Sequence, residues 1–280
     1  MISNQTWERI PFQAVSGTLT KDKTKTHLPF NIGAISKHGI THNNIGINNQ
    51  DAVHLVIEDN FIIGVLCDGA TNNHPNVVNS YSTNATGASL MTHMIANLCR
   101  ENITPRKNKM NREKFLLWMS EQVISRTKRL EQTLRVPEEY SKEFRHNLLT
   151  TTINAFIVRD NEYFTFHFGD GFVASNGKII ELEDDYISRF NTSPEIGIFK
   201  ETSYGLTKDL ISLALFSDGF KSKIIASNSM QNLFKTRLNQ NGYSDLIPEF
   251  HLKTLANLDE DLIHFWPKDD ATMILLRKSK

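Results

Sequence analysis

The stretch FIIGVLCDG, residues 61–69, is an unbroken apolar run that ends in an aspartate and a glycine. Two more segments share this design, FTFHFGDG at residues 164–171 and LALFSDG at residues 213–219. Short apolar runs bounded by turn residues predict buried β-strands, and glycine permits the sharp turn that follows each acid. Asp68, Asp170 and Asp218 therefore each end a predicted strand, where their oxygens are exposed at the edge of a sheet.

Acids stand at strand borders in other parts of the chain too. One Asp-Gly pair alone is typical of an ordinary tight turn, but three copies after apolar runs favour a shared site. Asp51 precedes the apolar pair Ala52-Val53, and Asp269-Asp270 precede ATMILL at residues 271–276. Carboxylate and carbonyl oxygens without histidine or thiolate suit Mg²⁺ or Mn²⁺ better than Zn²⁺ or copper.

Composition narrows the class of protein. The 280 residues fit one large domain or two small ones, and 39% of them are hydrophobic, which is enough to fill a sizeable core. Lysine plus arginine and aspartate plus glutamate balance at 31 each, so no net charge favours nucleic acid or a membrane surface as a partner. No stretch approaches the roughly 20 apolar residues of a membrane span, and no signal-peptide pattern precedes the first strand. We expect a cytoplasmic protein.

The apolar periodicity predicts two antiparallel sheets covered by helices. Residues 1–28 are expected to form an N-terminal extension and residues 29–280 one domain. Strands are predicted at 31–37, 52–58, 61–67, 148–158, 163–170, 172–174, 178–182 and 272–277, helices at 84–99, 116–134 and within 220–260, and irregular or polar connections at 101–112, 135–147 and 183–209. The strands from 148 to 182 are expected to form one continuous hairpin arrangement.

Six short motifs occur in an order that resembles a known family. They are Asn49-Gln50-Asp51-Ala52, Asp68-Gly69, Thr150-Thr151-Thr152, Gly169-Asp170-Gly171, Ser217-Asp218-Gly219 and Asp269-Asp270-Ala271-Thr272. In order, spacing and strand context they resemble the protein phosphatase 2C family, the metal-dependent Ser/Thr phosphatases of the PPM type, in its bacterial branch. The resemblance covers residues 31–277 and implies an α+β fold, the α-β-β-α four-layer sandwich of two antiparallel sheets flanked by helices.

The resemblance also implies roles for particular residues. Asp68 would bridge two Mg²⁺ or Mn²⁺ ions, and the Gly69 carbonyl would bind one of them. Asp218 and Asp269 would bind the other ion, and Asp51 would order a water bound at the metals. The expected reaction is hydrolysis of phosphoserine or phosphothreonine in a protein substrate, opposing a cognate Ser/Thr kinase. Residues 183–209 correspond to the variable flap of the family.

Three positions depart from the family pattern. The arginine that many members use to clamp phosphate is replaced by Gly46. Thr41-His42 resembles a Thr-His or Ser-His pair of one bacterial branch, so His42 is a candidate for phosphate contact, although a histidine that only finishes a turn is an equally good interpretation. His74, in the loop after Asp68-Gly69, is a candidate general acid, against the interpretation that it is merely solvated.

A third metal ion is disfavoured. In bacterial relatives it binds the aspartate of the Gly-Asp motif, here Asp170, and a second aspartate, where this chain has Ser222. Asp170 can instead accept backbone hydrogen bonds at its turn. The three threonines at 150–152 are interpreted as strand residues chosen for packing.

Two alternatives of other classes remain open at this point. The missing arginine, Gln50 and Ser222 favour a pseudophosphatase that binds a phosphorylated partner or kinase without turnover, whereas retention of Asp51, Asp68, Asp218 and Asp269 argues for the enzyme. A metal-dependent nuclease would also use clustered acids, but it needs a basic track that the neutral composition does not provide.

Overall fold

The computed structural model describes residues 28–45, 48–69, 84–103, 111–182, 199–221 and 269–278. In chain order the elements are β1 (Phe30–Lys37), α1 (Ile40–Ile45), β2 (Asp51–Glu58), β3 (Phe61–Asp68), α2 (Asn84–Ile103), α3 (Arg112–Thr133), α4 (Ser141–Leu148), β4 (Ile153–Arg159), β5 (Tyr163–Phe168), β6 (Gly171–Ser175), β7 (Lys178–Leu182), β8 (Lys200–Gly205), β9 (Ser212–Phe216) and β10 (Ala271–Lys278). Single turns of 3₁₀ helix lie at Glu138–Tyr140, Thr207–Asp209 and Asp218–Phe220.

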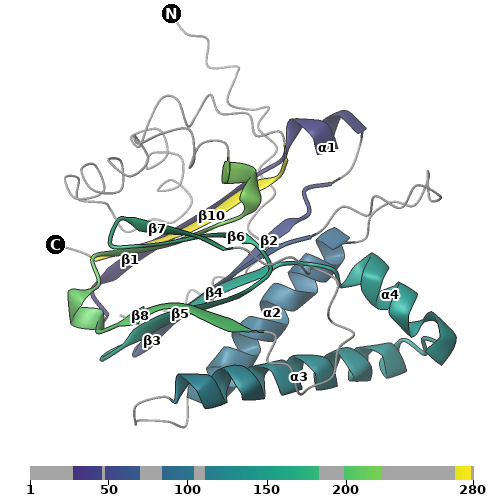
Figure 1. Cartoon of the computed structure of the whole chain (residues 1–280), viewed down its shortest axis with the longest axis horizontal. Helices are drawn as coiled ribbons and strands as arrows, with labels where there is room; N and C mark the ends of the chain where they lie inside the picture. The colour runs from purple at the N-terminus through teal and green to yellow at the C-terminus, as the bar shows by residue number, and fades with distance from the viewer. Residues whose placement is uncertain are drawn as a thin grey trace, which may run out of the picture.

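The strands of the described residues form two five-stranded sheets. The first has the order β1-β10-β9-β6-β7 and the second the order β2-β3-β4-β5-β8, and every neighbouring pair in both is antiparallel. Figure 1 shows the sheets stacked face to face, with α2 and α3 against the outer face of the second. The predicted pair of antiparallel sheets with helices is thus confirmed.

The inner strand β3 has an apolar sequence without interruption because both of its faces are covered. Neighbouring side chains of a strand point to opposite faces. Ile62 and Leu66 belong to the core between the two sheets, whereas Ile63 and Val65 belong to the core under the helices. Because β3 is covered on both faces, each position of its apolar run is buried.

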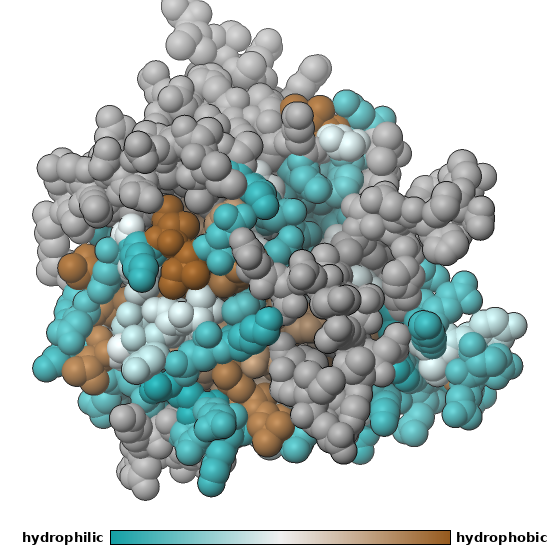
Figure 2. All heavy atoms as spheres, viewed as in Figure 1, coloured by the Kyte–Doolittle hydropathy of each residue, from teal (hydrophilic) through white to brown (hydrophobic). Residues whose placement is uncertain are grey.

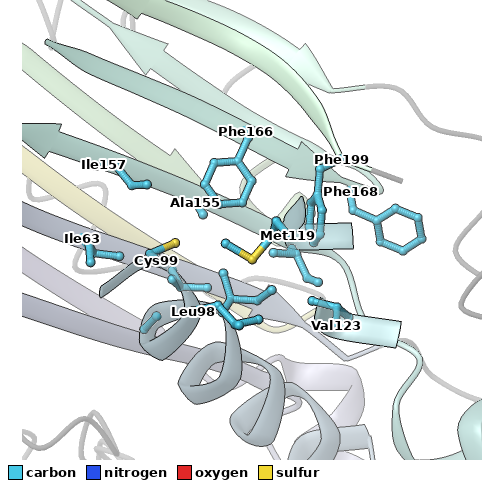
Figure 3. Packing of buried hydrophobic residues seen from close by; sticks show 14 of the residues in the cluster. Ile63, Leu98, Cys99, Met119, Val123, Ala155, Ile157, Phe166, Phe168 and Phe199 are labelled. Carbon is cyan, nitrogen blue, oxygen red and sulfur yellow. The ribbon is translucent and has the colours of Figure 1, made fainter. Parts of the chain in front are cut away.

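The second core lies between the β2–β8 sheet and helices α2 and α3. Figure 3 shows Leu98 and Cys99 of α2 beside Met119 and Val123, with Phe166 coming from the sheet. All five side chains are buried. The long helices predicted at 84–99 and 116–134 are present as α2 and α3, and Phe164, Phe166 and Phe168 of β5 belong to the same core.

The polar segment after α3 holds a helix that the sequence pattern did not predict. Residues 135–147 were expected to be a connection, but α4 occupies Ser141–Leu148. The guanidinium of Arg145 donates two hydrogen bonds to the carboxylate of Glu131, which is buried on α3. This charged pair docks α4 on α3, and the eight-residue helix has only Phe144 and Leu148 as apolar residues, which are too few for periodicity to indicate a helix.

The chain changes sheets after β5, which corrects the continuous hairpin arrangement expected from residue 148 to 182. β5 belongs to the second sheet and β6 to the first. Gly169 and Gly171 have φ values of +87° and +120°, which side chains rarely adopt. A Cβ at Gly171 would also meet the side-chain amide of Asn154. These glycines make the crossing possible, and Asp170 lies between them.

Part of the segment expected to be irregular is a strand. Residues 200–205 form β8, at the edge of the second sheet next to β5. Arg112 of α3 holds this edge: its Nε donates to Glu201 at 2.5 Å, and its guanidinium lies 3.8 Å from the centre of the Tyr204 ring. No residue of β8 is buried, so its sequence lacks the apolar signal of a buried strand.

Several predictions lie outside the described residues. These are the N-terminal extension up to residue 27, Gly46, His74, the flap at 183–198, Ser222 and most of the helical segment 220–260. Within the described part of the chain, no helix combines the length and apolarity needed to cross a bilayer. On the face drawn in Figure 2, hydrophobic side chains lie in separate areas between hydrophilic ones.

Gly87 of α2 provides a test of the α2–α4 contact. Alanine normally stabilises an exposed helix interior by about 1 kcal/mol relative to glycine. A Cβ at Gly87, however, would overlap the backbone carbonyl oxygen of Leu148 in α4. We therefore expect Gly87→Ala to lower the free energy of unfolding measured in urea. Asn97→Ala, on the exposed face of the same helix, should leave it unchanged or raise it slightly, and a stabilising Gly87→Ala would contradict the contact.

Candidate metal centre

Strand pairing sets Asp51 opposite Asp68. They are register partners at one end of the β2–β3 ladder, because Asp51 begins β2 and Asp68 ends β3. Gly69 extends the pairing by a bridge to Thr151, and its N–H donates to the Gln50 carbonyl at 3.2 Å. Two carboxylates predicted from separate motifs thus lie side by side at the edge of the second sheet.

The other sheet contributes Asp218 and Asp269. Asp218 follows β9 and Asp269 precedes β10, and these strands are antiparallel neighbours, so the end of one meets the start of the other. The N–H of Ser217 donates to the Thr272 carbonyl at 2.9 Å. A Cβ at Gly219 would overlap the backbone carbonyl of Asp270, which explains the glycine after Asp218.

The carboxylates of the two sheets are close enough to influence one another. Burial raises the pKa of Asp68 well above its ordinary value, and the neighbouring Asp51 and Asp218 carboxylates raise it further. Burial also raises the pKa of Asp218, with Asp170 and Asp269 acting in the same direction. The structure therefore brings together acids that are up to 218 positions apart in the sequence (Asp51 and Asp269).

One carboxylate oxygen of Asp51 accepts a hydrogen bond, and the other has no hydrogen-bond partner. Its Oδ2 accepts a hydrogen bond from the Ser217 hydroxyl at 2.9 Å, and the same hydroxyl accepts one from the Thr272 N–H at 2.8 Å. Its Oδ1 is buried without a hydrogen-bond partner. Burial is the main reason that the pKa of Asp51 rises to about 7, and hydrogen bonds from Thr272 and Ser217 oppose that rise. Sequence reasoning missed Ser217, which precedes a recognised acid and could have been found there.

The threonines at 150–152 do more than pack. The Thr151 hydroxyl and the Thr152 N–H both donate to the Asp68 carbonyl, at 2.7 and 2.8 Å. The Asp68 N–H donates in turn to the Thr152 hydroxyl at 3.2 Å. These bonds fix the backbone that carries Asp68 and Gly69, so the packing interpretation of this motif is incomplete.

His42 of α1 lies against the acidic pair that precedes β10, a strand of the first sheet. Its side chain is only 7% exposed. Its Nδ1 lies 2.8 Å from Asp270 Oδ2, and its Nε2 lies 3.5 Å from Asp269 Oδ1. The hydrogen bond to Asp270 is the main cause that raises the pKa of His42, and burial opposes it. These contacts are with carboxylates, so the expected phosphate contact stays a prediction.

Asp270 links three segments of the chain beside the acidic cluster, a role that its motif did not indicate. Its Oδ1 accepts from the Gly39 N–H at 2.7 Å, and its Oδ2 accepts from the Gln50 N–H at 2.6 Å as well as from His42. It therefore joins the start of β10 to the turn before α1 and to the start of β2. Its position beside a recognised acid was the available signal.

Asp170, between Gly169 and Gly171, is partly buried near the cluster. Burial raises its pKa, and the positive charge of Lys221 lowers it. Its backbone carbonyl accepts a hydrogen bond from the Asn154 side chain at 3.2 Å. This placement fits either a structural turn or a weak outer ligand, and its predicted roles remain predictions. His74 lies outside the described residues.

The cluster has the chemistry of a site for a hard divalent cation. Like-charged carboxylates in a buried gap are costly to ionise together unless a cation offsets them. The half-exposed Asp269, with a side chain 56% exposed, offers oxygens in the form that Mg²⁺ and Mn²⁺ bind, and the buried, unpartnered Oδ1 of Asp51 is an acceptor for a water bound at such an ion. The residues present therefore fit the ions expected from the sequence.

A comparison with models of protein families shows to which family the chain belongs. The family model for protein phosphatase 2C matches residues 38–256, which is most of the chain. The chain belongs to the protein phosphatase 2C family. The family predicted from the six motifs is thus confirmed, and no curated protein matches the sequence significantly.

Solved structures of the protein phosphatase 2C fold match over nearly the whole chain. A bacterial serine phosphatase variant is 13% identical with a TM-score of 0.54, and the match covers 91% of this chain and 100% of that one. PppA of Pseudomonas aeruginosa, a key regulatory component of T6SS, is 15% identical with a TM-score of 0.50, and the match covers 89% and 97% of the two chains. At these identities the likeness shows the fold.

The metal-free phosphatase 2C domain should lose stability as the pH rises. The folded pKa of Asp51, about 7 against an ordinary 3.8, means that the folded state binds this proton more tightly. Its contribution is therefore present at low pH and is lost as the pH rises through about 7, by about 1.4 kcal/mol per pKa unit. His54, whose burial lowers its pKa to about 4, acts in the opposite sense only below its ordinary 6.5.

Urea unfolding in EDTA between about pH 6.5 and 8.5 tests this expectation by comparing slopes, because His42, whose pKa is also raised, loses its proton in the same window and affects the wild type and the variants alike. Asp51→Asn should make the slope shallower, and Asp160→Asn, in the exposed β4–β5 turn, should leave it unchanged. Added Mn²⁺ should restore stability at the higher pH, since a ligand of the folded state stabilises it. Equal slopes for the wild type and Asp51→Asn would reject the assignment.

Proposed function

We propose that this chain is a protein phosphatase that hydrolyses phosphoserine or phosphothreonine with two Mg²⁺ or Mn²⁺ ions. The observation that carries the proposal is the convergence of Asp51, Asp68 and Asp218 from two sheets into one partly buried cluster. Membership of the protein phosphatase 2C family supports it. A fold could tolerate this concentration of negative charge most readily if cations bind there.

Four groups would hold the ions. Asp68, at the middle of the acidic cluster, would bridge them, with the Gly69 carbonyl as an additional ligand of one and Asp218 and Asp269 as ligands of the other. When bound, a pair of divalent ions supplies a nucleophilic water at neutral pH and neutralises charge on a phosphoryl oxygen. The threonines at 151 and 152 support this by fixing the Asp68 backbone.

Asp51 would orient the attacking water rather than bind an ion. Its Oδ2 is fixed by Ser217, which leaves Oδ1 as an acceptor of known direction in the site. A water that donates to this oxygen is held with its lone pair available for the phosphorus. Phosphate monoesters hydrolyse very slowly without a catalyst, so positioning and charge stabilisation must provide most of the rate enhancement.

The remaining roles extend the proposal. His74 would protonate the leaving serine or threonine oxygen, and Asp170 would at most contribute to a weak third ion. A cognate Ser/Thr kinase would supply the phosphorylated protein substrate. The pseudophosphatase alternative gains no support from the described residues, because its arguments rest on Gly46 and Ser222, outside them, and on Gln50, whose N–H serves the Asp270 network.

The proposal predicts metal-stimulated turnover that depends on the central acids. We expect release of phosphate from p-nitrophenyl phosphate and from a phosphothreonine peptide in Mn²⁺, and Asp68→Asn or Asp218→Asn should reduce kcat/KM by at least about 10³-fold, because preorganised charge stabilisation is lost. Asp160→Asn is the matched control, since it makes the same change in an exposed turn. Absence of turnover by the wild type in either ion, with the peptide still bound, would favour the pseudophosphatase instead.

A further inference from the structure

We propose that the groove between helices α2 and α3 is a docking site for an acidic, amphipathic helix of a protein partner. None of the residues that line this groove belongs to the acidic cluster at the strand ends. The inference therefore goes beyond the proposed phosphatase activity and does not depend on it.

The floor of the groove is apolar. Helices α2 and α3 lie on the outer face of the second sheet (Figure 1), and the groove between them has a volume of about 860 Å³. Leu90 and Met94 of α2 and Leu130 of α3 line it. The Leu90 side chain is 39% exposed, and Met94 is only partly buried against the core beneath the helices. Apolar side chains that gather at an exposed surface, with polar residues around them, are typical of interaction sites.

The rim of the groove is basic. Arg126, Lys128 and Arg129 of α3 line it, and none of the described residues in its lining is acidic. The guanidinium of Arg126 donates to Glu101 at 2.6 Å. Lys128 and Arg129 are exposed, and neither forms an ion pair with another described residue. The whole chain is neutral, with 31 basic and 31 acidic residues, so this concentration of positive charge is local.

The dimensions of the groove suit a helix. The part of α3 that lines it runs from residue 122 to residue 133, which is about 16 Å of helix and about three turns. Grooves between rows of helical side chains are where a neighbouring helix packs. An amphipathic helix would place its apolar stripe on Leu90, Met94 and Leu130 and its carboxylates beside Lys128 and Arg129.

Floor and rim together favour a protein partner over other polyanions. The phosphate backbone of a nucleic acid would pair with the cations but would gain nothing from the apolar floor. An anionic membrane surface is flat, so it would leave the floor of a concave groove uncovered. An acidic amphipathic helix is complementary to both features.

Titration of the full chain with a designed peptide tests the docking site. The probe is a fluorescent peptide of about 18 residues, with leucines at i, i+3, i+4 and i+7 spacing and glutamates at most other positions. A scrambled peptide of the same composition should bind at least about tenfold more weakly, because its leucines do not share one helical face. Binding of the helical probe should weaken as salt is added, since exposed charge pairs are screened.

Charge reversal at the rim gives the second measurement. Lys128→Glu combined with Arg129→Glu should weaken binding of the helical probe at least about tenfold, because like charges would then face each other. Lys178→Glu combined with Lys208→Glu is the matched control. It makes the same change in net charge at exposed positions outside the groove and should leave the affinity unchanged.

The floor is tested by one substitution and by methyl NMR. Leu90→Gln should weaken the probe about tenfold through loss of apolar contact, whereas Leu117→Gln, which replaces an exposed leucine of α3 outside the groove, should not. In the methionine-labelled wild type, the probe should shift the methyl resonance of Met94 and leave that of Met119, buried in the core, in place. Because the NMR experiment uses the wild type, it decides even if a variant fails to fold.

Three results would overturn the inference: no binding of the helical probe, equal binding of the scrambled peptide, or unchanged affinity after the rim reversal. Vesicles of phosphatidylglycerol or duplex DNA that bind through Lys128 and Arg129, when the peptide does not, would assign the surface to a membrane or a nucleic acid instead. All of these measurements report binding, so the phosphatase proposal stands or falls separately, by its own turnover test.

Discussion

The meeting of several partly buried carboxylates at strand ends of both β-sheets is the constraint around which this molecule is built. Ionised acids in a buried gap repel one another and lose hydration, so their pKa values rise. The two apolar cores supply the stabilisation that holds the acids together: one lies between the sheets and the other under helices α2 and α3. A divalent cation would relieve the repulsion, which links the stability of the domain to the occupancy of its site.

A network of hydroxyl, backbone N–H and imidazole groups holds the acids in place. Ser217 fixes Asp51, the threonines fix the backbone of Asp68, and Asp270 ties the start of β10 to Gly39, His42 and Gln50. These supports come from both sheets, so the two halves of the site are aligned by hydrogen bonds as well as by packing. Their bonds leave the buried Oδ1 of Asp51 without a hydrogen-bond partner and the Asp269 side chain half-exposed.

The strongest sequence predictions were those with a strong local signal. The run at 61–69 is apolar throughout because β3 is covered on both faces, and the helical faces of α2 and α3 recur at the spacing of a helix. The two elements that the sequence pattern did not predict, α4 and β8, lack such a local signal. α4 is docked by the Glu131–Arg145 pair, and β8 is an exposed edge held by Arg112, so neither carries an apolar pattern that periodicity could detect.

The sequence by itself determined the family, the strand-end aspartates and the oxygen-rich character of the site, because each of these is written in contiguous motifs. Tertiary structure alone decided which of those aspartates meet, the crossing between sheets at Asp170, and the pairing of His42 with Asp270. Residues 42 and 270 are 228 positions apart. Their contact follows from the alignment of β1 with β10, and pairing between distant strands is set by the packing of the whole sheet.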